Sequence, residues 1–156
     1  MGNYKRIEFD FINRTLALIS QYENNLHKYP YEEQYNYTLL INCLLGLIVM
    51  PKEKVISHIP NGRLTKELLQ EMGLEESQIN PDIIDLRDLI MKLRHSVAHF
   101  DIRVKSYDDC DRIDEIIFLD QEKNTSEMIR FRSTELLPFI RYYASWLQHN
   151  IQNYGQ

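Results

Sequence analysis

The sequence is poor in the residues that break or cross-link a chain. Its 156 residues include only five glycines, five prolines and two cysteines, which argues against collagen-like repeats, low-complexity segments and a disulfide framework. Cys43 and Cys110 stand too far apart in the sequence to suggest a zinc site built from cysteines. This cysteine usage fits a reducing, cytoplasmic environment best.

Long apolar runs and a positive net charge are also missing. No stretch approaches the roughly 20 apolar residues that a spanning helix needs, and the N-terminus lacks an apolar signal core. We therefore expect neither membrane insertion nor secretion. The formal net charge is −5, so any support for nucleic-acid binding has to come from a local cluster of cations.

The chain does contain enough apolar residues, 44% of the total, for one packed core. At this length we expect a single domain, residues 1–156. Four stretches have apolar residues at helical spacing and predict four long helices: 6–28, 31–50, 81–100 and 133–151. Pro81 is expected in the first turn of the third helix, because proline suits that position.

Two weaker patterns complete the predicted architecture. Residues 65–72 predict a short connector helix, because glycine and proline interrupt the pattern on both sides. Apolar residues at 102–104, 116–119 and 129–131 predict three short antiparallel strands in a meander. The expected fold class is mainly α: a helical bundle of four long helices and a short connector helix, with the small β-meander before the last helix.

The most unusual residues lie at the end of the third predicted helix, where residues 93–100 read LRHSVAHF. The stretch 87–105 has a net charge of +3, although the chain as a whole is acidic. An arginine such as Arg94 holds charge on phosphate oxygens, and a histidine such as His99 transfers protons near neutral pH. This chemistry suits RNA cleavage in which the substrate's own 2′-hydroxyl is the nucleophile.

Arg94 and His99 are five residues apart, which separates them by about 140° around an ideal helix. They converge if the helix end relaxes, or if two copies face each other in a homodimer and complete a shared cleft. Two different roles for these residues stay open. Cations at a helix C-terminus stabilise the helix dipole without any catalytic role. His95 and His99 also share a helical face that suits a metal, although no third ligand is evident.

The segment LRHSVAHF resembles the signature of the HEPN domain family, whose ribonuclease members carry an arginine followed a few residues later by a histidine. Residues 38–53, TLLINCLLGLIVMPKE, are similar to the second helix of a prokaryotic, often plasmid-borne branch of that family. That branch also has strands before its last helix, so the resemblance covers nearly the whole chain. It implies a metal-independent endoribonuclease that cleaves single-stranded RNA as a homodimer and needs no cofactor.

Residue by residue, the resemblance implies that Arg94 stabilises charge on the phosphate, that His99 is the general acid or base, and that His95 orients or assists. Four flanking polar residues are the expected substrate contacts: Lys92, Ser96, Arg103 and Lys105. The implied products are a 2′,3′-cyclic phosphate and a 5′-hydroxyl. The implied role is that of a toxin or phage-defence effector, restrained by an antitoxin or another regulatory partner.

One position departs from the toxin branch that is partnered with a nucleotidyltransferase antitoxin. That branch has a tyrosine two residues after the histidine, which can be adenylylated, and this chain has Asp101 there. The carboxylate either orients a histidine or repels RNA. The alternative function is a catalytically silent HEPN module that binds a nucleotide, a nucleic acid or a partner protein, and the acidic net charge favours it.

Tyrosines are concentrated in the N-terminal half of the chain, and five of them fall within residues 22–37. Aromatic rings stack on the bases of single strands. They also fill cores and interfaces, which is the commoner use of such residues. Both interpretations stay open from the sequence.

Overall fold

The computed structural model describes residues 5–50, 59, 62–108, 112–120 and 126–154, so Cys110 lies outside the described residues. The helices are α1 (Ile7–Asn25), η1 (Leu26–Lys28), η2 (Tyr31–Glu33), α2 (Asn36–Val49), α4 (Lys66–Glu71), α5 (Leu86–His99) and α6 (Ser133–Tyr154). The strands are β1 (Gln78–Ile79), β2 (Ile102–Lys105), β3 (Glu115–Asp120) and β4 (Ser126–Arg132). The fold is mainly α, as predicted.

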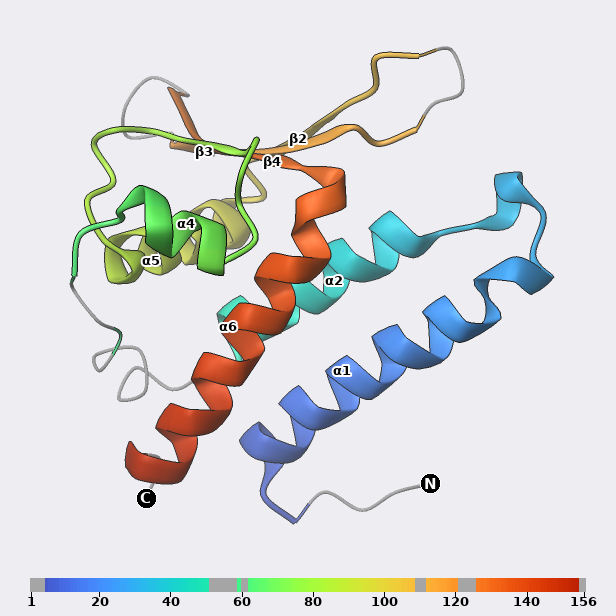
Figure 1. Ribbon diagram of the computed structural model, residues 1–156, viewed down its shortest axis with the longest axis horizontal. Helices are drawn as coiled ribbons and strands as arrows, with labels where there is room; N and C mark the ends of the chain where they lie inside the picture. The colour runs from blue at the N-terminus through green and yellow to red at the C-terminus, as the bar shows by residue number, and fades with distance from the viewer. Residues whose placement is uncertain (1–4, 51–58, 60–61, 109–111, 121–125, 155–156) are drawn as a thin grey trace.

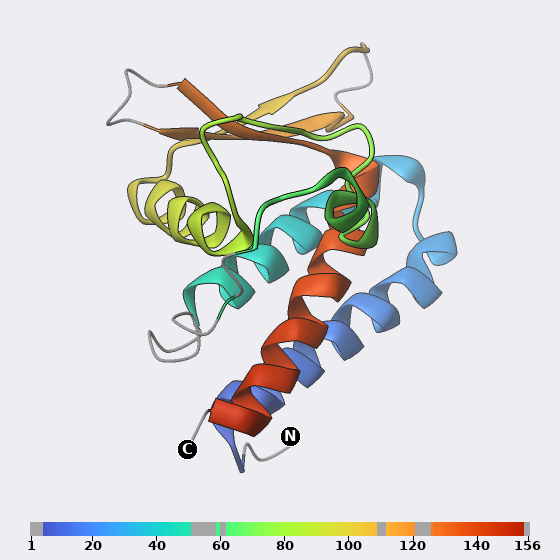
Figure 2. The ribbon, with the colours of Figure 1, turned by 60° about the vertical axis from the view of Figure 1, so that its left-hand side comes forward.

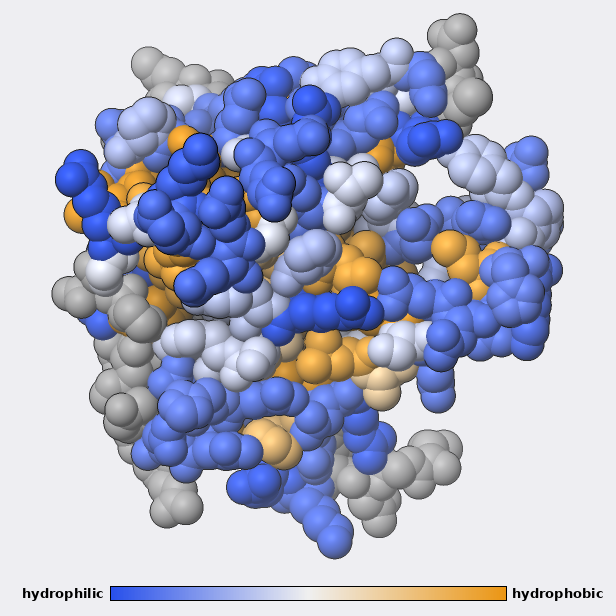
Figure 3. Space-filling model, viewed as in Figure 1, coloured by the Kyte–Doolittle hydropathy of each residue, from blue (hydrophilic) through white to orange (hydrophobic). Residues whose placement is uncertain are grey.

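Helices α1, α2 and α6 pack against one another, and α1 and α6 run antiparallel side by side (Figures 1 and 2). Their contact is made by fully buried side chains, among them Ile19, Leu44, Leu47 and Phe139. Figure 3 shows a largely hydrophilic face on which apolar residues are visible along the junctions of these helices. Burial of this apolar surface is the main stabilising contribution to the helical layer.

The helix expected over residues 31–50 begins later than predicted, with α2. The side-chain amide of Gln34 donates a hydrogen bond to the carbonyl of Tyr29 at 3.0 Å. The hydroxyl of Tyr22 accepts one from the backbone N–H of Tyr35 at 2.6 Å. Side chains thus satisfy backbone groups of the connection between α1 and α2, which contains only the short 3-10 helices η1 and η2 in place of an α-helix.

The prediction of a helix over residues 81–100 is wrong at its beginning, because α5 starts only after Asp85. Pro81 lies in a turn in which the side chain of Asn80 accepts a hydrogen bond from the backbone N–H of Asp82 at 3.0 Å. Such an Asx turn competes with a helix for the same backbone groups. The spacing of apolar residues does not predict this turn, because Asn80, which forms it, is polar.

The strand order of the sheet is β1-β4-β3-β2, and every pair is antiparallel. The predicted meander of β2, β3 and β4 is confirmed, whereas the number of three strands is wrong because β1 pairs with β4 at the edge. Side chains on the inner face of the sheet belong to the core: Ile116, Phe118, Ile129 and Phe131. The described helices cover this face alone and leave the outer face open (Figures 1 and 2).

Strand β4 continues into α6 without a loop, because Ser133 follows Arg132 directly. In the first turn of α6, the carboxylate of Glu135 accepts hydrogen bonds from the three backbone N–H groups of residues 75–77, at 2.8–3.0 Å, and from the Ser77 hydroxyl at 2.6 Å. Burial alone raises the pKa of the Glu135 carboxyl, but these hydrogen bonds outweigh it and hold the pKa below its ordinary value. One carboxylate therefore fastens the segment before β1 to α6.

Candidate active site on helix α5

Helix α5 carries the arginine and histidine motif, and its first turn and buried side fix its orientation. Asp85 has an extended backbone, and its carboxylate accepts a hydrogen bond from the backbone N–H of Asp88 at 2.7 Å, which is the geometry of an N-cap. The buried side consists of Leu86, Leu89, Ile90 and Leu93. The apolar spacing over residues 81–100 predicts one seam that runs to Phe100. This prediction is confirmed in the middle of the helix, where the seam is buried, and wrong at Phe100, which is 78% exposed. The buried side determines which motif residues face outward.

Arg94 lies at the border of that seam. Its side chain is half-buried, and Nη1 donates a hydrogen bond to the carbonyl of Ile48, near the end of α2, at 3.3 Å. Burial raises the pKa of the Tyr143 phenol on α6, and the positive charge of Arg94 partly opposes that rise. Arg94 therefore lies where α5, α2 and α6 meet.

His95 and His99 face solvent on a different side of α5. Both side chains are exposed, and their ring centroids are 4.5 Å apart with the ring planes inclined by 53°. The structure thus brings the two histidines together and directs Arg94 away from them, as the angular separation on the helix predicts. Exposed imidazoles can exchange protons with solvent or with a bound substrate.

The C-terminus of α5 closes through a left-handed residue. Phe100 has φ 56° and donates its N–H to the carbonyl of Val97 at 3.1 Å, and the N–H of Asp101 bonds the carbonyl of Ser96 at 2.8 Å. The buried Ser96 hydroxyl donates to the Asp101 carbonyl at 2.8 Å, and that carbonyl also accepts from Leu119 of β3 at 2.9 Å. Ser96, expected as a substrate contact, thus fastens the helix end to the sheet.

The cations of the stretch 87–105 do not form one patch. Nε and Nη2 of Arg87 donate to the carbonyl of Ile59 at 3.0 and 2.7 Å. Lys92 forms an ion pair with Asp88 at 3.2 Å, one helical turn earlier. These two cations are therefore engaged within the chain, and the positive charge that the sequence suggested is divided between α5 and the sheet.

Lys92 and His95 line a shallow depression together with Met91, Asp120 and Met128. Across the described part of the chain, no group of three or more His, Cys, Asp or Glu side chains is placed to hold a metal ion. The two histidines of α5 are thus without a third ligand of these types in that part of the chain.

The outer face of the sheet carries four cations, which we call the basic sheet face: Arg103, Lys105, Arg130 and Arg132. Ile117 of β3 lies between Arg103 and Arg130 in the strand register. Glu115 lies in the same way between Lys105 and Arg132. Directly opposed residues of antiparallel strands point to the same face. The two arginines of β4 were missed by the sequence reasoning, because only the register brings them beside β2.

Ion pairs occupy part of this face. The buried carboxylate of Glu115 lies 3.5 and 3.3 Å from guanidinium nitrogens of Arg130 and Arg132. It also accepts a hydrogen bond from the Tyr107 hydroxyl at 2.6 Å, which raises the pKa of that phenol. The two cations of β2 have no ion-pair partner among the described residues, so they are the ones available to a ligand.

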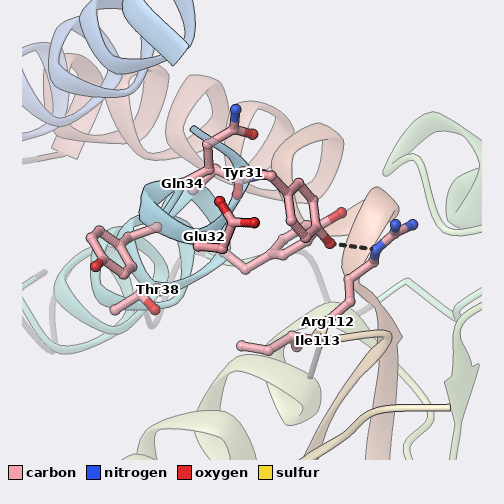
Figure 4. A pocket seen from close by; sticks show the side chains of 9 residues that line it. Tyr31, Glu32, Gln34, Thr38, Arg112 and Ile113 are labelled. Carbon is pink, nitrogen blue, oxygen red and sulfur yellow. Dashed lines mark hydrogen bonds between the residues drawn. The ribbon is translucent and has the colours of Figure 1, made fainter. Parts of the chain in front are cut away.

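A separate cavity of about 600 Å³ lies between the α1–α2 connection and the hairpin that joins β2 to β3 (Figure 4). One wall includes Tyr31, Tyr35 and Tyr37, and the other consists of Arg112 and Ile113. Nε of Arg112 donates to the Tyr31 hydroxyl at 2.9 Å, and the guanidinium carbon lies 5.7 Å from the centroid of that ring. The sequence analysis noted the cluster of tyrosines that lines this cavity. It did not identify Arg112, which lies on the opposite wall.

Among the described residues, no helix combines the length and the apolar character needed to cross a bilayer. A family model described as HEPN pEK499 p136 matches residues 1–154. No curated protein and no solved structure matches the chain.

Proposed function

The chain belongs to the HEPN pEK499 p136 family, and on that premise we propose that it is a metal-independent endoribonuclease that cleaves single-stranded RNA. One observation carries the proposal. His95 and His99 form an exposed pair at the end of α5, on the same helix as the half-buried Arg94. Two adjacent groups that exchange protons and one fixed cation are the parts that this chemistry needs.

In the proposed reaction the 2′-hydroxyl oxygen attacks the adjacent phosphorus, and the bond from phosphorus to the 5′-oxygen breaks. His99 is the principal acid or base, and His95 assists, so that one imidazole takes the 2′-hydroxyl proton and the other protonates the leaving 5′-oxygen. Arg94 stabilises the charge on the non-bridging oxygens. The products are a 2′,3′-cyclic phosphate and a 5′-hydroxyl, with no metal or other cofactor.

The proposed homodimer follows from the positions of Arg94 and His99 on the two sides of one exposed strip of α5. On an ideal helix, Ala98 and Met91 fall between them, at about 40° and 60° from Arg94, and His99 lies at about 140°. Ala98 and Met91 are both exposed, so they offer an apolar strip on which α5 of a second protomer can pack. A two-fold contact there brings His99 of each protomer toward Arg94 of its partner and completes a composite site.

The biological role that we propose rests on the family. A ribonuclease of this kind acts in the cytoplasm as a toxin or phage-defence effector, held in check by an antitoxin or another regulatory partner. Residues 1–156 then form one domain in which α1, α2, α5 and α6 are the HEPN-type bundle.

The test is cleavage of an end-labelled single-stranded RNA in the presence of EDTA. Wild type should cleave and leave cyclic-phosphate ends, and His99→Ala should lose about a hundredfold or more of the rate. His149→Ala is the matched control, because His149 is an exposed histidine on α6, away from the motif. Absence of cleavage by a folded wild type across several RNAs contradicts the proposal.

A mixed-chain experiment tests the composite site. Arg94→Ala and His99→Ala chains are each inactive alone, but a mixed dimer contains one site with both residues intact. Random mixing should therefore restore about a quarter of the wild-type activity. No recovery from confirmed mixed dimers shows that each site is built within one chain.

The second candidate is a silent binding module, and one observation favours it: Arg94 donates to the Ile48 carbonyl instead of facing the histidines. This candidate predicts RNA or nucleotide binding that survives His99→Ala, with no cleavage by wild type. The same assay therefore separates the two candidates.

A further inference from the structure

We propose that the cavity between the α1–α2 connection and the β2–β3 hairpin binds one unpaired base of single-stranded RNA, stacked on Tyr35 or Tyr31, with Arg112 as the phosphate contact. The choice of RNA as the ligand rests on the proposed function. The site itself shares no residue with the motif of α5.

The size and walls of the cavity suit a nucleotide. Its volume of about 600 Å³ lies within the usual range of small-molecule sites, about 300–1,000 Å³. Figure 3 shows the surface hollowed between the hairpin and the connection, and Figure 4 shows Arg112 reaching across to Tyr31. The cavity is thus open at the surface, so that one base of a longer strand can enter it.

Two of the tyrosines offer free aromatic surface. The side chain of Tyr35 is 61% exposed and that of Tyr31 is 51% exposed. The backbone of Tyr35 is fixed by its hydrogen bond to the Tyr22 hydroxyl, so the exposed ring projects from an anchored position. An exposed aromatic ring on a fixed backbone is a suitable stacking surface for a base, because little order has to be created on binding.

Polar groups in the cavity suit the edges of a base better than a free anion. Asn36 and Thr38 line it, and their amide and hydroxyl groups both donate and accept hydrogen bonds. The carboxylate of Glu32, which also lines it, accepts from an exocyclic amino group. The Tyr31 hydroxyl and the nearby carboxylates of Asp108 and Asp114 raise the pKa of Arg112 and offset part of its charge, so the cavity favours an uncharged base with a phosphate at the rim.

Arg112 keeps donors for that phosphate. Its Nε is used by the Tyr31 hydroxyl, while neither Nη nitrogen makes a hydrogen bond within the described residues. The guanidinium is held over the Tyr31 ring, which positions it in advance for a charge-assisted contact.

Strand β2 connects the cavity with the motif, which favours an RNA strand over a lone nucleotide. It begins just after α5 and ends at Lys105, whose carbonyl accepts a hydrogen bond from the N–H of Asp114 in the hairpin at 2.9 Å. At about 3.3 Å per residue, β2 spans roughly 10 Å. The cations Arg103 and Lys105 lie along it and are available to successive phosphates.

The experiment measures binding of a fluorescein-labelled single-stranded RNA by anisotropy. All chains carry His99→Ala, so that the probe stays intact. Tyr35→Leu and Arg112→Gln should each weaken binding about tenfold, and Tyr35→Phe should retain it, because the ring and not the hydroxyl stacks. Tyr29→Leu is the matched control, since Tyr29 is an exposed tyrosine of the same connection outside the cavity. Its affinity should stay within about twofold.

Each outcome is decisive for the cavity. Unchanged affinity of both cavity variants, an equal loss in the Tyr29→Leu control, or no RNA binding by the His99→Ala background overturns the site. Cleavage is scored separately. If the cavity variants lose affinity while wild type does not cleave RNA, the site stands and the proposed ribonuclease fails. If wild type cleaves and the cavity variants bind normally, the ribonuclease stands and the site fails.

Discussion

Phe100 occupies at the end of α5 the position that Gly73 occupies at the end of α4. Gly73 has φ +74°, its N–H bonds the carbonyl of Gln70 at 2.9 Å, and the N–H of Leu74 bonds the carbonyl of Leu69 at 2.8 Å. The turn at Phe100 has the same pair of hydrogen bonds. A left-handed backbone is easy for glycine and strained for phenylalanine. The strained backbone is therefore that of Phe100, directly after His99, and this residue is 78% exposed.

Replacing Phe100 by glycine should stabilise the protein. Relief of the left-handed strain contributes about 1 kcal/mol, which raises the melting temperature by about 2–4 °C in a chain of this size. Thermal denaturation measures the change. Phe100→Ala keeps a Cβ in the strained position and serves as the control. A melting temperature of Phe100→Gly no higher than that of Phe100→Ala contradicts the strain argument.

Gly73→Ala should destabilise the protein strongly. A Cβ at this position would lie 2.3 Å from the Cβ of Pro138, and the backbone has positive φ, so strain and overlap together should cost about 2 kcal/mol or more. Gly62→Ala is the matched control, because a Cβ there meets nothing within 4 Å. Urea unfolding of the two variants gives the comparison, and equal stabilities would remove the packing argument.

The carboxylate of Glu135 should make the free energy of unfolding depend on pH in the acidic range. Its pKa is lowered in the folded state because hydrogen bonds from residues 75–77 outweigh burial. The ionised carboxylate therefore stabilises the folded state fully at pH values above the ordinary pKa of a glutamate, which applies to the unfolded chain. This stabilisation is lost as the pH falls from that pKa to the lower pKa of Glu135 in the folded state. Urea unfolding between about pH 7 and pH 3 should show a smaller loss for Glu135→Gln than for wild type. Glu33→Gln, at an exposed glutamate, should follow wild type.

A charge at Ala98 should separate the proposed dimer. Ala98→Glu places a carboxylate in the middle of the strip between Arg94 and His99, where two copies of α5 would bury it, and that is costly. Light scattering should show a dimer for wild type and a monomer for the variant. Ala17→Glu, at an exposed alanine of α1, is the control. A wild type that is monomeric at assay concentration is incompatible with the composite site.

The cations of β2 should set the salt dependence of RNA binding. Arg103→Gln with Lys105→Gln should weaken binding and reduce the slope of log affinity against log salt by about 0.7 for each phosphate that is no longer neutralised. A control pair of exposed cations away from this face, Arg63→Gln with Lys66→Gln, should keep the wild-type slope. Titrations at several salt concentrations measure both, and equal slopes for the two pairs would exclude a role for β2.

The sequence was most informative where apolar residues repeat over several turns. The spacing in α5 predicted its buried side, and the separation of about 140° predicted that Arg94 and His99 point in different directions. It failed where polar side chains decide the backbone. Asn80 forms the turn that delays α5, and Gln34 satisfies the connection before α2. Neither hydrogen bond produces a periodic pattern of apolar residues from which it could be predicted.

Contacts between residues far apart in the chain could not be predicted from the sequence either. Arg130 and Arg132 join the basic sheet face only through the register of β4 with β3, and Arg112 reaches Tyr31 across 81 positions of the chain. The two-residue strand β1 is too short to show a period. Local patterns therefore predicted the helices and the motif, while the surroundings of the site required the fold.

The carboxylate of Glu135 bonds backbone groups 58–60 positions earlier in the chain, and so closes a ring that contains the whole sheet and α5. Closing a loop of that length carries an entropic cost, and contacts between sequence neighbours form with less of it. Helices α1 and α2 are such neighbours. Helix α6 therefore completes two parts of the molecule at once: the ring that contains the sheet and α5, and the helical layer with α1 and α2.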